Sequence, residues 1–157
     1  MIMKHSPLLL CLLIAFGTLQ AADAIYRDSS GRSIGTASTR NGRTTYRDRS
    51  GRSVGTAVTQ PGGRTIYRDR SGRSVGTAVT QPNGTTTFRD ASGRSIGTAH
   101  PSPNGSKTLY RDRSGRLLGT GDLQPNGSVI FRDASGRRVG TASSGQALPP
   151  PDTLFKP

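Results

Sequence analysis

The sequence of 157 residues contains no tryptophan and no glutamate, one cysteine (Cys11) and two histidines (His5 and His100). A single thiol cannot form a disulfide within the chain, and three soft ligands are too few for a zinc, haem or iron–sulfur site. Four tyrosines and four phenylalanines are the only aromatic residues, which excludes a large aromatic core. The sequence therefore predicts no disulfide scaffold, no metal centre and no cofactor.

Negative charge is also scarce. The chain has nine aspartates and 22 lysines and arginines, which gives a formal net charge of +13. An excess of this size, spread over a short chain, predicts an anionic partner.

A long apolar run occurs only near the N-terminus. It extends from Leu8 to Phe16, follows a basic residue and precedes the small-residue segment 22–24. This three-part layout is typical of a secretory signal peptide, and the run is shorter than the roughly 20 residues of a membrane-spanning helix. We predict that residues 1–24 are a signal peptide cleaved after Ala24, with Ala21 and Ala22 as alternative sites. The mature chain then has no transmembrane segment, and its destination is the periplasm, the cell surface or the medium.

A motif recurs six times in the remaining chain. It has the form [YF]-R-D-x-S-G-R-x-[IVL]-G-T-[AG], and consecutive copies are 20, 21, 21, 22 and 21 residues apart. The copies begin at Tyr26, Tyr46, Tyr67, Phe88, Tyr110 and Phe131. We predict a repeat domain over residues 25–142 and a proline-rich, disordered tail over residues 143–157.

Two kinds of turn punctuate each copy. In Asp69–Gly72 the aspartate favours the first position of a type I turn, and Gly72 supplies the positive φ that re-enters a strand. Between copies lies a second turn built from Asn-Gly or from Pro with Gly, as in Pro82-Asn83-Gly84. Each copy therefore predicts two short antiparallel strands, or about twelve in all.

The turn also predicts which residues face one another. If 69–72 is the tip of a hairpin, Tyr67 lies opposite Val75 and Arg68 opposite Ser74. One face is then aromatic and aliphatic, and the other carries arginines beside small residues such as Gly76. The predicted fold is all-β: tandem β-hairpins in an elongated antiparallel meander or solenoid-like sheet. The low content of large apolar residues leaves a disordered basic polypeptide as an alternative.

The segment Pro82–Ile96 resembles the YD repeats of bacterial Rhs proteins and teneurins. Asp-x-x-Gly-Arg followed by an aliphatic residue is present in every copy, although arginine stands where that family places a tyrosine before the aspartate. The resemblance covers residues 26–142, and the repeats are more distantly similar to hairpin repeats of the MORN type. It implies an exported bacterial surface or secreted repeat protein without catalytic activity.

The arginines of the repeats are the candidate binding residues, because guanidinium groups bind carboxylate, sulfate and phosphate bidentately. One set precedes the aspartate of each copy and the other follows the glycine of the turn. The first set is Arg27, Arg47, Arg68, Arg89, Arg111 and Arg132, and the second is Arg32, Arg52, Arg73, Arg94, Arg116 and Arg137. Arg49, Arg70 and Arg113 add charge to three of the turns.

This array predicts a non-enzymatic protein that binds an anionic polymer such as a polysaccharide, lipopolysaccharide or host glycan. Two alternatives stay open: a structural protein that self-associates through its unpaired terminal strands, and a disordered basic secreted polypeptide. Export and the lack of a stacking platform on the basic face disfavour nucleic acid. His100 has no counterpart in other copies, and each turn offers one carboxylate among arginines, so neither catalysis nor calcium binding is predicted.

Overall fold

The computed structural model describes residues 22–143, which form strands and turns. The strands, in chain order, are β1 (Ala22–Asp28), β2 (Ser33–Arg40), β3 (Arg43–Asp48), β4 (Ser53–Gln60), β5 (Arg64–Asp69), β6 (Ser74–Thr80), β7 (Thr86–Asp90), β8 (Ser95–Pro101), β9 (Lys107–Asp112), β10 (Leu117–Leu123), β11 (Val129–Asp133) and β12 (Arg138–Ala142). Two strands per copy, and twelve over the described residues, confirm the predicted hairpin repeat.

The N-terminal boundary of the fold lies before the predicted cleavage site. Residues 22–24 belong to β1, where they pair with β2, and Ala24 is fully buried. The rest of the predicted signal peptide and all of the predicted tail except Ser143 lie outside the described residues.

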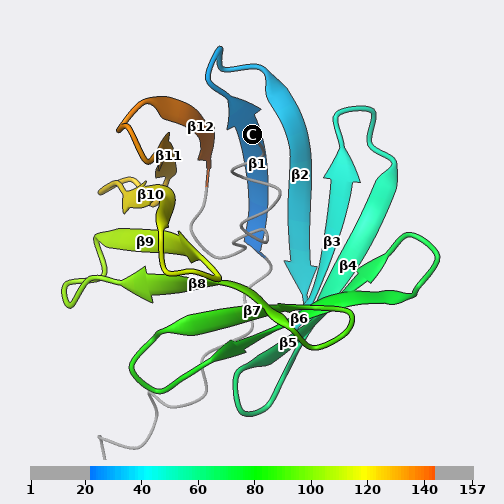
Figure 1. Cartoon of the computed structure of the whole chain (residues 1–157). Helices are drawn as coiled ribbons and strands as arrows, with labels where there is room; N and C mark the ends of the chain where they lie inside the picture. Colours follow the sequence, from blue (N-terminus) through cyan, green and yellow to red (C-terminus); the bar gives the residue numbers. More distant parts are fainter. Residues whose placement is uncertain (1–21, 144–157) are drawn as a thin grey trace, which may run out of the picture.

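The sheet is a closed barrel, not the elongated meander that the sequence predicts. Each strand pairs antiparallel with the next, and β1 returns to pair with β12 through Tyr26↔Ala142, Arg27↔Thr141 and Asp28↔Gly140 (Figure 1). Ser143 and Ile25 extend this seam, since each donates its backbone N–H to the other residue. A twisted sheet of this length can curl back on itself, and closure gives hydrogen-bond partners to both edge strands.

A β-bulge in each hairpin corrects the predicted register. Arg68 lies opposite Ser74 as predicted, but Tyr67 lies opposite Gly76, because Val75 is the extra residue of a bulge. The glycines of the Gly-Thr-Ala segments therefore do not share the basic face. They are buried on the inner face, next to the aromatic residues.

The interior of the barrel is filled by one aromatic ring per copy. Each ring lies between a glycine on one neighbouring strand and an alanine on the other, except that Gly121 takes the alanine's place beside Phe131. Tyr67, for example, is flanked by Ala57 and Gly76. The fully buried rings of Tyr110 and Phe131 contact each other with centroids 6.5 Å apart. Large and small residues thus alternate around the circumference, and few aromatic residues suffice for a small core.

At several of these positions only glycine fits, because the next hairpin approaches closely. A Cβ added to Gly55, Gly76 or Gly97 would lie 2.5 Å from the carbonyl oxygen of the arginine in the following copy. The same contact joins Gly140 to Arg27 across the β1–β12 seam. The repeat therefore fixes the spacing of successive hairpins by backbone contact, and the closing pair obeys the same rule.

Candidate functional site: the tip rim

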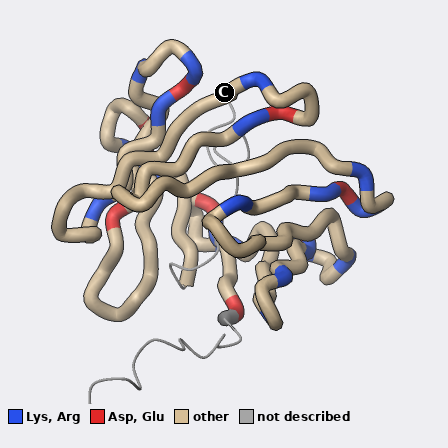
Figure 2. Tube along the Cα trace, turned by 90° about the horizontal axis from the view of Figure 1, so that it is seen from below, with Lys and Arg blue, Asp and Glu red and all other residues tan. Residues whose placement is uncertain are grey.

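The six intra-copy turns lie at one end of the barrel, which we call the tip rim; each tip runs from the aspartate to the following arginine. The tips are residues 28–32, 48–52, 69–73, 90–94, 112–116 and 133–137. The five inter-copy turns lie at the other end, which we call the opposite rim. Lys, Arg and Asp are concentrated at the ends of hairpins that project from the body of the barrel (Figure 2).

Backbone hydrogen bonds close each tip. In the third copy the N–H of Gly72 donates to the carbonyl of Asp69 (3.0 Å), and the N–H of Asp69 donates to the carbonyl of Arg73 (2.9 Å). Gly72 has a φ of 82°, as the sequence predicts for a glycine that follows a type I turn. The turn chemistry read from the sequence is thus confirmed.

The aspartate carboxylate is committed to the backbone of its own turn. Oδ1 of Asp69 accepts hydrogen bonds from the N–H groups of Ser71 (2.8 Å) and Arg73 (3.0 Å). The corresponding pair of bonds is present in each of the other five tips. The sequence predicts the place of the aspartate in the turn, whereas the two N–H donors to its carboxylate are seen only in the structure.

Two tip aspartates have an additional partner. Ser50 Oγ donates to Asp48 Oδ1 at 2.6 Å, and Ser135 Oγ donates to Asp133 Oδ1 at 2.7 Å. These hydroxyl bonds, with the backbone bonds and the nearby arginines, lower the pKa values of Asp48 and Asp133. Both carboxylates are therefore ionised near neutral pH and hold their turns closed.

The arginine before each aspartate braces the tip from outside. Arg68 Nη1 donates to the carbonyl of Gly72 at 2.9 Å, and the other five strand arginines make the same bond at 2.8–3.1 Å. This bond occupies one donor of a guanidinium group that has five. The side chains of Arg27, Arg47, Arg68 and Arg89 are exposed, and those of Arg111 and Arg132 are half-buried.

The arginine that follows the glycine contributes its backbone N–H to the aspartate and leaves its side chain exposed in all six tips. A guanidinium–carboxylate contact within a tip is formed by Arg116 Nε and Asp112 Oδ2, 3.6 Å apart, with the Arg116 side chain 83% exposed. Each tip and the arginine before it therefore have one aspartate and two arginines, and the exposed Arg49, Arg70 and Arg113 add a third arginine to three tips. All twelve arginines of the predicted array lie at or next to this one rim.

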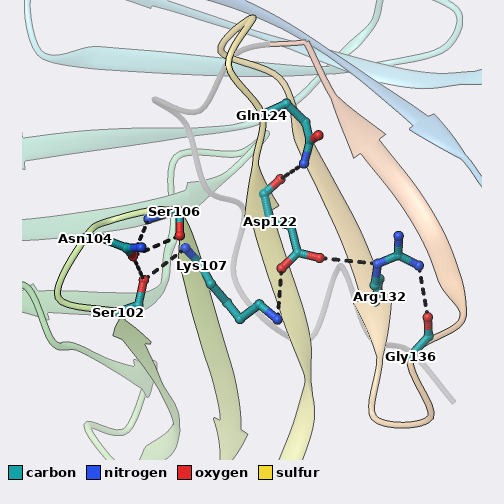
Figure 3. A network of polar contacts seen from close by, with 8 residues as sticks. All are labelled: Ser102, Asn104, Ser106, Lys107, Asp122, Gln124, Arg132 and Gly136. Carbon is teal, nitrogen blue, oxygen red and sulfur yellow. Dashed lines mark hydrogen bonds and ion pairs between the residues drawn. The ribbon is translucent and has the colours of Figure 1, made fainter.

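One aspartate outside the tips, Asp122, forms ion pairs on the outer surface, and the sequence does not predict them. Asp122 on β10 lies between β9 and β11 and contacts Lys107 Nζ at 3.5 Å and Arg132 Nε at 3.2 Å (Figure 3). Arg132 also lies opposite Arg138, where the other copies have serine or leucine. Because like charges opposite one another are unfavourable, we interpret Asp122 as local compensation for this pair.

The tyrosines of the repeats belong to the core cluster or pack against it. Burial raises the pKa of Tyr46 to about 12. It also raises the pKa values of Tyr26 and Tyr110, and the hydroxyls of Tyr46, Tyr67 and Tyr110 add to the shift of Tyr26. These phenols stay neutral near pH 7.

His100 lies on the outer face of β8, where Nε2 contacts Thr98 Oγ1 at 3.0 Å. Within residues 22–143, no three His, Cys, Asp or Glu side chains are grouped so that they could hold a metal ion. The same part of the chain contains no helix long and apolar enough to cross a membrane.

Comparisons with known proteins give distant structural similarities. No protein-family profile and no curated protein matches the chain. Among solved structures, BamB from Moraxella catarrhalis aligns with a TM-score of 0.27 and 12% identity, over 78% of this chain and 76% of that one. The resemblance to YD and MORN repeats stays a prediction.

Proposed function

We propose that this protein is a non-enzymatic binding protein whose tip rim takes an anionic polymer. The proposal rests on the difference between the carboxylates and the guanidinium groups at the tips. Each carboxylate accepts two backbone N–H groups of its own turn, while the neighbouring guanidinium groups keep free donors on an exposed surface. Every tip thus has an excess of positive charge that the rest of the turn does not neutralise.

The arrangement suits a polymer better than a single small anion. Neighbouring tips are two strands apart, or roughly 10 Å where the strands leave the barrel wall. Arginines at this spacing can be bridged by successive charged groups of one chain, and each added contact multiplies the affinity. A small anion could reach one tip only.

The predicted export of the chain narrows the polyanions that it could bind to those outside the cytoplasm. An exported protein meets anionic polysaccharides, lipopolysaccharide and, in a host, sulfated glycans before it meets nucleic acid. The rings of the repeat face the interior of the barrel, so the basic outer surface lacks the aromatic platform on which single-stranded nucleic acids stack.

The self-associating alternative depended on unpaired terminal strands. In the described residues β1 and β12 pair with each other, so this particular route to a fibre has no free edge to use.

The test is binding to dextran sulfate, with uncharged dextran as the ligand control. The tip variant Arg49→Gln/Arg70→Gln/Arg113→Gln removes three exposed charges from the tip rim. The matched variant Arg40→Gln/Arg43→Gln/Arg64→Gln removes three exposed charges from the opposite rim. We expect the tip variant to bind about tenfold more weakly and with a shallower salt dependence.

The matched variant should stay within about twofold of the parent protein. Equal losses in the two variants would mean that net charge, and not the tip rim, governs binding. Failure of the parent protein to bind at low salt would refute the proposed function.

A further inference from the structure

Apolar side chains are exposed next to the charged tips. Ile34, Val54 and Val75 are 53%, 50% and 50% exposed. Each is the extra residue of a β-bulge, two positions after the arginine that ends its tip. Three of the six hairpins therefore present an aliphatic side chain just inside the ring of arginines.

The equivalent residues of the other three hairpins indicate which way these side chains face. Ile96, Leu118 and Val139 are partly buried and pack against the core cluster inside the barrel. Tyr46 and Tyr67, the rings of the hairpins that carry Val54 and Val75, are likewise only partly buried, whereas Tyr26, Phe88, Tyr110 and Phe131 are buried. The wall formed by β2–β6 is thus the less completely covered part of the inner surface at the tip end.

The position of the aliphatic residues relative to the turn decides what could cover them. Val75 is three residues from Gly72, which places it roughly 10 Å behind the turn along the strand. A flat apolar surface would meet the arginines of the tips first. A ligand with an apolar chain and a charged end could instead reach past the tips and leave its charge among them.

We propose that the tip end of the barrel binds an anionic amphiphile of the lipid class, a single aliphatic chain with a phosphate, sulfate or carboxylate head. The chain would lie against Ile34, Val54 and Val75, and the head would be bound by guanidinium groups of the tips. This inference rests on the proposed function, because the head takes the place of one charged group of the polymer. It adds an apolar contact that a polysaccharide does not use.

The test compares three ligands by titration calorimetry below their micelle concentrations. Dodecyl phosphate has both parts, inorganic phosphate has only the head, and dodecyltrimethylammonium has the same chain with a cationic head. We expect dodecyl phosphate to bind at least about tenfold more tightly than either control, since burial of a methylene-rich chain and charge complementarity act together. Equal affinity for dodecyl phosphate and either control would overturn the inference.

A pair of matched variants locates the apolar contact. Ile34→Ser/Val54→Ser/Val75→Ser changes the proposed lining, and Ile25→Ser/Val79→Ser/Leu123→Ser changes three exposed aliphatic residues elsewhere. The first should weaken dodecyl phosphate binding by about tenfold and the second should leave it unchanged. The nearly isosteric double variant Val54→Thr/Val75→Thr gives the same test if the triple variant does not fold. Equal effects from lining and control variants would overturn the inference.

Dextran sulfate separates this inference from the proposed function. The lining variant should bind dextran sulfate like the parent protein, because it keeps every tip arginine. Dextran sulfate binding without dodecyl phosphate binding would overturn the inference and leave the proposed function standing. Binding to phosphatidylglycerol vesicles without binding to monomeric dodecyl phosphate would also overturn it, in favour of a bilayer surface.

Discussion

The two ends of the barrel differ in how closely their turns resemble one another. At the tip rim the same turn occurs six times, with the same four backbone hydrogen bonds to the aspartate and the same guanidinium bond to glycine. At the opposite rim the connections are residues 41–42, 61–63, 81–85, 102–106 and 124–128, and the first two are shorter than the last three and differ from them in their hydrogen bonds. Uniformity at one end and variation at the other indicate that the tips share a requirement which the other turns do not.

The opposite rim is held by more varied contacts. Threonine hydroxyls pair across strands at Thr39–Thr44, Thr59–Thr65 and Thr80–Thr86. In the fourth connection Asn104 and Ser102 organise the loop through side-chain bonds (Figure 3). These connections join hairpins, whereas the tips also concentrate charge.

The largest expected effect is the loss of stability when a side chain is added at the close backbone contact between hairpins. Gly76→Ala would place a Cβ 2.5 Å from the carbonyl oxygen of Arg89, a backbone atom that cannot move without its strand. We expect a loss of about 3 kcal/mol or more in the free energy of unfolding, measured by denaturant titration. The matched change Gly121→Ala meets only side chains at 3.3–3.4 Å and restores the alanine of the other copies, so it should cost less than about 1 kcal/mol. Equal costs would show that hairpin spacing is not fixed by this glycine.

A smaller effect is expected from the capping residues of the two rims. Asp69→Ala removes the acceptor of two backbone N–H groups and should cost about 1–2 kcal/mol. Asn83→Ala on the opposite rim removes the acceptor of one, the N–H of Thr85, and should cost about 0.5–1 kcal/mol. Thermal melts of the two variants give the comparison. A reversed order would contradict the stronger role assigned to the tip.

The repeated turn is the part of the fold that the sequence predicts best. Asp69 and Gly72 act over four residues, so their local chemistry determines the hairpin whatever surrounds it. The position of Val75 could not be predicted in the same way, because a bulge depends on the twist of both strands. Closure could not be predicted either, since pairing of Tyr26 with Ala142 depends on curvature accumulated over all six copies.

In the candidate site, too, the residues can be predicted from the sequence and their long-range contacts cannot. The sequence identifies all twelve arginines of the array, because they are part of the repeat. It does not predict that Arg68 would donate to the Gly72 carbonyl, nor that Asp122 would meet Arg132 from another copy. Both contacts depend on side-chain directions that the bulge and the closed barrel impose.

The smallest expected effect distinguishes tips from one another. Because Ser50 holds the pKa of Asp48 below its ordinary value of 3.8, this carboxylate stabilises the fold above about pH 4. That contribution is lost as the pH falls through the lower pKa of the folded state. Ser50→Ala should raise the pKa of Asp48 towards the ordinary value in an NMR titration, and the carboxylate of Asp133 should titrate as before. An unchanged pKa of Asp48 in this variant would show that the Ser50 hydroxyl does not donate to the carboxylate.

Closure of the six hairpins into one ring is the most consequential feature, because it brings the first and last tips together and turns the row of tips into a ring. Spin labels at Ser29→Cys and Ala134→Cys mark the first and last tips, and labels at Ser29→Cys and Arg49→Cys mark two consecutive ones. Double electron–electron resonance should give similar distances for the two pairs of labels, since β1 pairs with β12. An open sheet would separate the first and last tips by ten strands, or roughly 50 Å, and that result would contradict the barrel and the ring of tips that depends on it.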